Sequence, residues 1–260
     1  MRHSKRQQMA QDAAQRRRNK TTRRWAFVQG VMALLSAAML AYGGYQALVH
    51  PDTPLPREWN PTKALVISDP VTPLTGWKLA RAAADPETCV ATLEGYAALD
   101  VLEPLEDSTQ CFISDRVALR QVGQSRLSPV ETRCAIALRT AMWERHSLQP
   151  AAIDLLGAPI ARISHIGSYN CRRLRSSSGT STRMSTHATA NAIDIAGFDL
   201  ADGTRIRLLE DWEQPGAKSA FLRAARDGAC EWFRLTLSPD YNRLHADHFH
   251  LQATGWGLCR

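Results

Sequence analysis

Histidines are scarce in this chain, yet four of the eight lie in two short segments. The segments are STHATANAID (residues 185–194), with His187 and Asp194, and HADHFH (residues 245–250), with His245, His248 and His250. Imidazole nitrogens and carboxylate oxygens are typical zinc ligands, and three protein ligands leave a fourth position to water, as in catalytic zinc sites. We therefore predict a catalytic zinc site formed by His187, Asp194 and His250.

The local sequence supports this interpretation. On a β-strand, His248 and His250 would point to the same face, while Phe249 and Leu251 would point to the opposite, buried face. Asp194 lies within the apolar run AIDIA, where an unpaired carboxylate would cost several kcal/mol and a metal ion would compensate it. Each segment alone also fits a simpler interpretation: hydrogen-bonded surface histidines, and an N-cap or buried salt-bridge partner for the aspartate. The two together favour a metal.

The hydrophobic periodicity of the chain predicts both helices and strands to carry these segments. Helices are expected at residues 77–84, 86–96, 128–146, 150–156 and 217–229, and strands at residues 159–166, 192–200, 205–209, 233–237 and 248–252. The third helix rests on Ser128-Pro129-Val130-Glu131, which has the pattern of a capping box. Asp202-Gly203 predicts a hairpin turn. This order indicates an α+β domain with a small antiparallel β-sheet that carries the zinc site and is flanked by helices.

Four regions follow one another along the chain. Residues 1–24 hold nine basic residues and one acidic residue, and residues 25–49 contain no charged residue. The second region is long enough to cross a membrane as a helix, with the basic tail in the cytoplasm and the remaining chain in the periplasm. A cleaved signal peptide is the alternative. Residues 50–75 hold six prolines and are expected to form an extended spacer. Residues 76–260 then form the globular domain.

The charge distribution and the cysteines narrow the class of protein further. Most of the net charge of +7 lies in the basic tail, so the composition does not favour a nucleic-acid partner. All six cysteines follow the apolar segment, without a CxxC pair, which indicates three disulfides in an oxidising compartment, with buried free thiols as the alternative. Six cysteines allow fifteen pairings. The expected pairs are Cys89–Cys111, Cys134–Cys171 and Cys230–Cys259.

The region from Trp77 to Cys259 resembles the bacterial extensin-like C-terminal domain family. The segments that carry this resemblance are TGWKLARAAADPETC, RISHIGSYNCR, STHATANAIDIAGF, RAARDGACEWF and PDYNRLHADHFHL. The spacing of Ser-x-His, the later aspartate and the final His-x-His is also similar to that of the LAS metallopeptidases. This group includes lysostaphin-type enzymes, D-Ala-D-Ala peptidases and the zinc domain of hedgehog. The resemblance implies an LAS-like or hedgehog-like fold around one zinc ion.

The resemblance also implies residue roles, with His187, Asp194 and His250 as the zinc ligands. His248 corresponds to the histidine that assists proton transfer in such enzymes. Asp247 stands where D-Ala-D-Ala peptidases carry a glutamate base, and its shorter side chain is a departure from the family pattern.

The same comparison assigns the substrate side of the site. Arg172 resembles the substrate-binding arginine, although the motif around it has an inverted order and an insertion. Tyr169 and Ser185 are the other candidates for substrate binding, and Ser185 is expected to orient the loop that bears His187. His245 is expected in a solvated turn, with a place at the rim of the site as the alternative.

Three functions fit these features. The first is a periplasmic, membrane-anchored zinc peptidase or amidase that hydrolyses a peptide bond of peptidoglycan. The second is a non-catalytic zinc module that binds peptidoglycan or an envelope protein. The third is a tethered structural protein of envelope assembly whose basic tail contacts anionic lipids.

Overall fold

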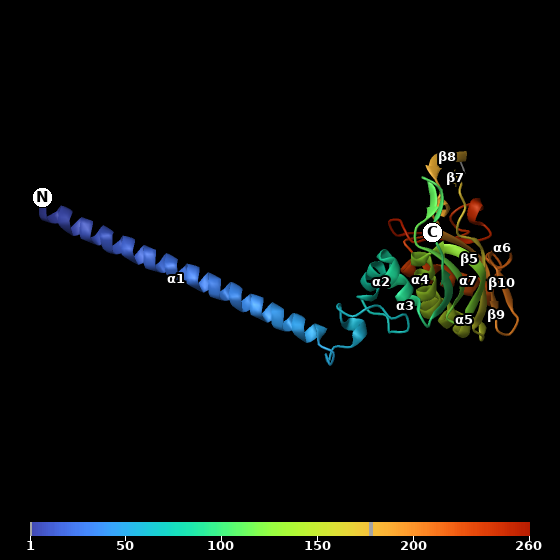
Figure 1. The fold of residues 1–260 in the computed structure, drawn as a ribbon, viewed down its shortest axis with the longest axis horizontal. Helices are drawn as coiled ribbons and strands as arrows, with labels where there is room; N and C mark the ends of the chain where they lie inside the picture. Colours follow the sequence, from blue (N-terminus) through green and yellow to red (C-terminus); the bar gives the residue numbers. More distant parts are fainter. Residues whose placement is uncertain (1, 177–178) are drawn as a thin grey trace. The chain divides into compact units, whose positions relative to one another are not determined.

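The computed structural model describes residues 2–176 and 179–260 and divides the chain into two compact units, Met1–Lys63 and Ala64–Arg260 (Figure 1). In the first unit, one helix, α1 (Arg2–Val49), includes both the basic and the apolar segment. Its part Gln15–Val49 is long and apolar enough to cross a membrane, a property that an N-terminal signal sequence shares. The short helix η1 (Arg57–Trp59) follows.

The second unit contains the remaining described elements. Its helices are α2 (Thr75–Ala84), α3 (Pro86–Leu93), α4 (Cys134–Trp143), the π-helical turn η2 (Glu144–Leu148), α5 (Gln149–Leu156), η3 (Thr186–Thr189), α6 (Leu208–Asp211), α7 (Ala217–Trp232) and η4 (Arg243–His245). Its strands are β1 (Ala97–Val101), β2 (Leu105–Ser108), β3 (Cys111–Ile113), β4 (Arg116–Val122), β5 (Ser125–Arg133), β6 (Ile160–Gly167), β7 (Arg173–Ser176), β8 (Gly179–Met184), β9 (Ala192–Leu200), β10 (Arg205–Arg207), β11 (Leu235–Leu237), β12 (Phe249–Gln252) and β13 (Leu258–Cys259).

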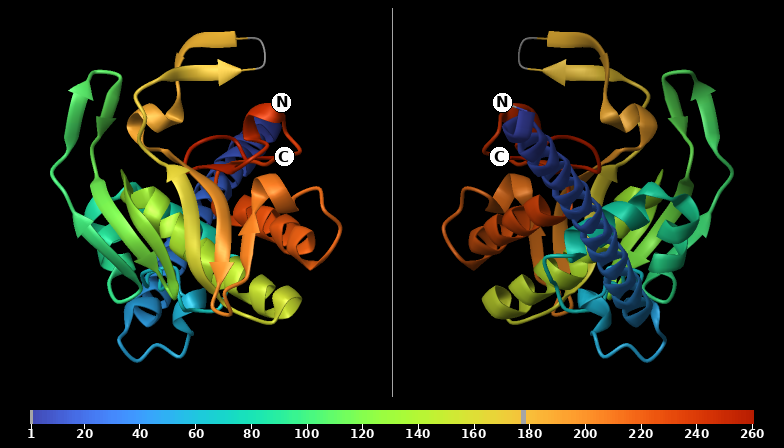
Figure 2. Two further views of the ribbon diagram at one scale, coloured as in Figure 1. Left: turned by 90° about the vertical axis from the view of Figure 1, so that its right-hand side faces the viewer. Right: turned by 90° about the vertical axis from the view of Figure 1, so that its left-hand side faces the viewer.

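Nine strands form one mixed sheet in the order β1-β4-β5-β6-β9-β12-β11-β13, with β10 paired to β9. The pairs β5–β6 and β11–β13 are parallel, and the other pairs are antiparallel. The α+β class is therefore confirmed, but the sheet is larger than the small antiparallel sheet that was expected, and it is mixed. Two further hairpins, β2–β3 and β7–β8, project from the sheet (Figure 2).

The hydrophobic core lies on one face of the sheet, where α4 packs on β4 and β5, and α7 packs on β11 and β13. Alternation places Ile193 and Ile195 of β9 and Phe249 and Leu251 of β12 on this face, and all four are fully buried. The residues between them must therefore point to the opposite face. This alternation is what turns Asp194 and His250 away from the core.

The expected helix at Ser128-Pro129-Val130-Glu131 is wrong, because these residues belong to β5 and the helix begins only at Cys134. Val130 pairs with Leu119 of β4, and its buried side chain follows the alternation of a strand. Pro129 is exposed and lies where the register of the two strands shifts. It has no partner residue on β4, so the sheet does not need the N–H that proline lacks. Pairing with β4 therefore overrides the local capping-box pattern.

Several other expectations need correction. Strands β1 to β5 precede α4, so the order is not helices first and then strands. The segment expected as a strand at 205–209 ends at Arg207 and continues as α6, and the strand expected at 233–237 begins at Leu235. Leu65 and Ile67, from the region expected to be an extended spacer, are buried in the core of the second unit. The expected strand at 192–200 and the hairpin turn at Asp202-Gly203 are confirmed.

Three disulfides are present, as expected, but two of the expected pairings were wrong. The observed pairs are Cys89–Cys134, Cys111–Cys171 and Cys230–Cys259. The first joins α3 to the start of α4, two helices that pack against each other. The second joins β3 to the segment that leads into β7. Pairing follows this tertiary proximity, which spacing along the chain does not encode.

A buried carboxylate, Glu144, fastens the end of α4 to the sheet. Its oxygens accept hydrogen bonds from Tyr96 Oη (2.6 Å), Ser125 Oγ (3.1 Å), Gln149 Nε2 (2.9 Å) and the backbone N–H of Gln124 (3.2 Å). Burial and these contacts raise the pKa of the Tyr96 hydroxyl above its usual range. Both carboxylate oxygens of Glu144 therefore accept hydrogen bonds within the fold, which indicates a structural role.

Candidate metal centre

Asp194 and His250 face each other across the ladder between β9 and β12, where they are register partners. Both side chains lie on the sheet face opposite the core, yet both are buried. The hydrophobic neighbours of each residue fix its strand in place. The apolar pattern of the two strands therefore positions a carboxylate and an imidazole side by side.

His187 reaches the same point from η3. Ser185 caps this short helix, because its Oγ accepts a hydrogen bond from the backbone N–H of His187 (3.3 Å). The helix ends at Ala190, whose φ of 47° is left-handed. The orientation of the His187 ring is fixed by a hydrogen bond from its Nδ1–H to the carbonyl of Ser168 (2.7 Å). Ser168 in turn donates to the carbonyl of Ala192 at the start of β9 (2.6 Å), which ties η3 to the sheet.

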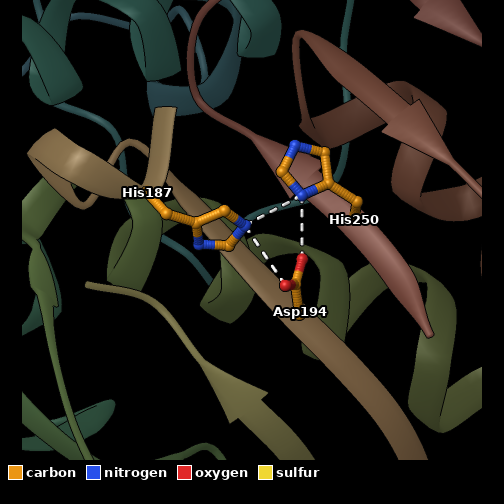
Figure 3. A group of neighbouring side chains, drawn as sticks. All are labelled: His187, Asp194 and His250. Atoms are coloured by element: carbon orange, nitrogen blue, oxygen red, sulfur yellow. Dashed lines mark hydrogen bonds and ion pairs between the residues drawn. The ribbon is translucent and has the colours of Figure 1, made fainter. Parts of the chain in front are cut away.

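The three side chains converge on one point (Figure 3). His187 Nε2 lies 3.1 Å from His250 Nδ1 and 3.2 Å from Asp194 Oδ2, and His250 Nδ1 lies 2.8 Å from Asp194 Oδ1. Because the Nδ1 proton of His187 is used by Ser168, a neutral His187 turns a lone pair towards Asp194. Two acceptors at this distance repel unless a cation lies between them. The donor set therefore fits a metal ion.

The electrostatics of the group agree with this interpretation. Burial alone would raise the pKa of Asp194, but the neighbouring rings of His187 and His250 outweigh it and hold the pKa below its usual range. Burial lowers the pKa of His250, against the opposing effect of Asp194. An ionised carboxylate and a neutral imidazole are the states in which these side chains bind a metal ion.

Behind His250 lies Gln252, with 2.7 Å between the Nε2 atoms of the two side chains. A histidine that binds a metal through Nδ1 carries its proton on Nε2 and usually donates it to an acceptor. Rotation of the Gln252 amide by about 180° would present its oxygen to that proton. Sequence reasoning missed this residue, although its position two residues after His250 on the same strand face was a usable signal.

The proposed proton-transfer residues lie beside the group. His248 precedes β12, and its Nε2 is 3.7 Å from Asp194 Oδ1. Its Nδ1–H donates to Asp247 Oδ1 (2.7 Å). The side chain of Asp247 is exposed, so this carboxylate orients His248 rather than pointing into the buried group.

A pocket of about 420 Å³ opens beside the group, and of the three side chains Asp194 and His250 line it. It is lined by Ile166, Arg172, Leu174, Arg175, Ser185, Asp194, Leu237, Tyr241, Asn242, Leu244, His245, Asp247, His248, His250 and Gln252. Arg172 and Ser185 line this pocket. Tyr169 does not line it, and its hydroxyl donates to Asp107 (3.0 Å).

His245 differs from its expected place in a solvated turn. It is half-buried in the pocket lining, where its Nδ1–H donates to Asn242 Oδ1 (2.8 Å). Burial, together with His250 and His248, lowers the pKa of His245 to about 4, so the ring is neutral at neutral pH. His245 is the last residue of η4 and lies three residues before His248, and this short spacing was the signal for its place at the pocket.

A protein-family match covers most of the second unit, Ala64–Arg260. Residues 87–260 match the family model of the extensin-like protein C-terminus. No curated protein and no solved structure matches the chain. The matched residues include all three side chains of the metal centre and the whole lining of the pocket. The chain therefore belongs to the extensin-like protein C-terminus family.

Proposed function

We propose that this protein is a membrane-anchored zinc peptidase or amidase that hydrolyses a peptide bond in the stem peptides or cross-links of bacterial peptidoglycan. The observation that carries the proposal is the convergence of His187, Asp194 and His250, two of which, Asp194 and His250, also line a pocket. Pockets of this size accommodate small molecules and short peptide segments.

Zinc fits the donor set better than a hard cation. Magnesium and calcium favour six or more oxygen ligands, whereas zinc accepts nitrogen and carboxylate ligands in tetrahedral sites. Ligand atoms about 2.0–2.1 Å from a tetrahedral zinc ion lie about 3.3 Å from one another. The observed separations of 2.8, 3.1 and 3.2 Å are close to that value.

The residues around the group suit hydrolysis. Bound zinc would supply Lewis-acid chemistry, which activates water and polarises the substrate carbonyl. His248 Nε2 lies where it can accept the proton of the attacking water and return it to the leaving amine, while Asp247 holds the ring. Arg172 lines the pocket and would stabilise negative charge that develops on the carbonyl oxygen.

The location follows from the rest of the chain. Three disulfides suit an oxidising compartment such as the periplasm. The basic residues before the apolar segment favour a cytoplasmic N-terminus and one membrane crossing. Peptidoglycan is the peptide-containing polymer outside the bacterial cytoplasmic membrane. The motif similarity to LAS metallopeptidases supports the same substrate class.

A non-catalytic zinc module is the second candidate, and one observation favours it. Asp247 occupies the place of the glutamate base in D-Ala-D-Ala peptidases, but its carboxylate is exposed and bonded to His248. Such a module would bind zinc and peptidoglycan without cleaving either the stem peptides or the cross-links.

One experiment separates these candidates. Zinc content and muropeptide masses are measured for full-length wild type and His187→Ala, with His165→Gln as a control because His165 lies outside the group and contacts the Ser128 carbonyl. We expect about one zinc ion per chain and new muropeptides for wild type and the control only. Bound zinc with unchanged muropeptides would favour the binding module, and the absence of zinc would refute both.

A further inference from the structure

The hairpin β7–β8 beside the pocket carries an unusual concentration of positive charge. Four arginines lie between residues 172 and 183, and no acidic residue occurs from residue 171 to residue 193. They are Arg172, Arg173, Arg175 and Arg183. The hairpin projects from the sheet, with β7 and β8 at the top of Figure 1 and in yellow to orange in Figure 2. Its charge is therefore presented to solvent and to the pocket mouth.

This charge is not neutralised within the described part of the chain, where none of the four arginines forms an ion pair with an acidic residue. The side chain of Arg173 donates to the Thr182 carbonyl across the hairpin (2.7 Å), a neutral partner. Asp107, on the neighbouring hairpin β2–β3, accepts from the Tyr169 hydroxyl instead. The guanidinium groups thus remain able to bind an anion.

Two of the four arginines, Arg172 and Arg175, line the pocket together with Leu174. The register between β7 and β8 shifts between Arg173 and Arg175, and this irregularity interrupts the usual alternation of side chains. Arg175 is exposed, whereas Arg172 is half-buried. The sequence had singled out only Arg172.

The acidic residues of the pocket cannot offset these arginines. Asp194 at the base is engaged by His187 and His250, and Asp247 is bonded to His248. Arg172 and Arg175 are thus not paired with either carboxylate of the pocket. The apolar side chains of Ile166 and Leu174 line the same side and are exposed.

We propose that Arg175 and the hairpin β7–β8 form a specificity element that binds a free carboxylate of a peptide ligand. The inference rests on the proposed function, because it takes the ligand of the pocket to be a peptide. A guanidinium group binds a carboxylate through two parallel hydrogen bonds, which an amide does not reproduce. The pocket thus selects peptides with free carboxylates over their amidated forms.

Binding can be measured apart from hydrolysis. Full-length His248→Ala protein is titrated by calorimetry with a synthetic stem pentapeptide that has free carboxylates and with its fully amidated counterpart. We expect the acidic peptide to bind about tenfold more tightly, and Arg175→Gln to remove about that factor, as the loss of one charged hydrogen-bonded contact implies. The affinity for the amidated peptide should not change, and Arg175→Lys should restore only part of the preference.

Arg126→Gln is the matched control, because Arg126 is an exposed arginine of β5 that does not line the pocket. Equal binding of the two peptides, no binding of either, or an equal effect of the Arg126 and Arg175 variants would overturn the proposal. Zinc content and hydrolysis are measured in parallel on wild type. A wild type without zinc or hydrolysis that still prefers the acidic peptide would refute the proposed enzyme and leave the specificity element standing.

Discussion

The second unit contains two buried carboxylates that the chain treats in opposite ways. Glu144 is 1% exposed, and its carboxylate accepts four hydrogen bonds, two from hydroxyls, one from a side-chain amide and one from a backbone N–H. Asp194 is 8% exposed and meets two imidazole rings at the base of a pocket. All four partners of Glu144 donate a hydrogen bond to its carboxylate. Asp194 faces two imidazole rings, whose nitrogens can either donate or accept a hydrogen bond.

The difference shows how similar burial can serve structure or chemistry. The donors around Glu144 compensate its desolvation permanently, and Gly123 beside it has no room for a side chain, since a Cβ would collide with the carboxylate. The partners of Asp194 compensate it only when a cation, either a proton or a metal ion, is shared among them. A buried carboxylate whose neighbours all donate hydrogen bonds to it, like Glu144, thus indicates a structural role. A buried carboxylate whose neighbours can also accept, like Asp194, indicates a binding site.

The largest expected effect lies at Asp194. Asp194→Asn removes the charge that a zinc ion would neutralise, so zinc content should fall from about one per chain to near none. Hydrolysis should decrease at least about a thousandfold, as for other essential catalytic groups. The circular dichroism spectrum of the zinc-free variant should match that of zinc-free wild type. Elemental analysis and muropeptide release test this, and full zinc occupancy in the variant would contradict it.

Glu144→Leu should affect stability instead of chemistry. The substitution removes the acceptor of four donors, of which those of Ser125 and Gln149 are buried, and we expect the free energy of unfolding to decrease by about 1–3 kcal/mol for each buried donor left unpaired. Urea unfolding of zinc-free protein measures this change, with the exposed Glu231→Leu as a control. Zinc stoichiometry of the folded fraction should remain unchanged. A loss of zinc without a loss of stability would reverse the contrast between the two carboxylates.

Gln252 gives a smaller effect that tests the orientation of His250. Gln252→Leu removes the acceptor for the Nε2 proton, and zinc affinity should weaken by about 10–100-fold. Gln252→Glu keeps an acceptor and should bind zinc at least as tightly as wild type. Competition with a chelator provides the affinities, and the exposed turn variant Gln110→Leu is the control. Equal affinities for the Leu and Glu variants would show that the contact does not orient His250.

The smallest effect concerns His146, which is half-buried outside the metal centre and donates to the carbonyl of Ile67 (2.7 Å). Burial lowers its pKa in the folded protein, while the unfolded chain has the ordinary value of about 6.5. The unfolded state therefore binds the proton first as the pH falls, and stability decreases below about pH 6.5. His146→Gln should make urea unfolding less dependent on pH between about 7.5 and 5.5. An unchanged slope would contradict this.

The sequence predicted the region around β9 and β12 well, because there the alternation of apolar residues and the burial of strands agree. It placed Asp194 within an apolar strand, and it placed His250 on the strand face opposite the buried Phe249 and Leu251. It failed at Ser128-Pro129, where pairing with β4 overrides a local helix signal, and it missed Gln252 and Arg175, which differ from other polar residues only through their surroundings. The disulfide pairings also depend on which helices and hairpins meet in the folded chain.

The disulfide between Cys111 and Cys171 affects the stage at which the chain can reach its final covalent structure. Cys171 immediately precedes Arg172, so this bond fixes one end of the arginine-bearing hairpin to β3. Thiols remain reduced in the bacterial cytoplasm and are oxidised after export. In the proposed topology, a newly made chain would acquire this tether only after export, so the segment that leads into β7 would be fixed on the side of the membrane where the proposed peptide ligand occurs. The order of synthesis, export and oxidation would then decide when the proposed binding site is complete.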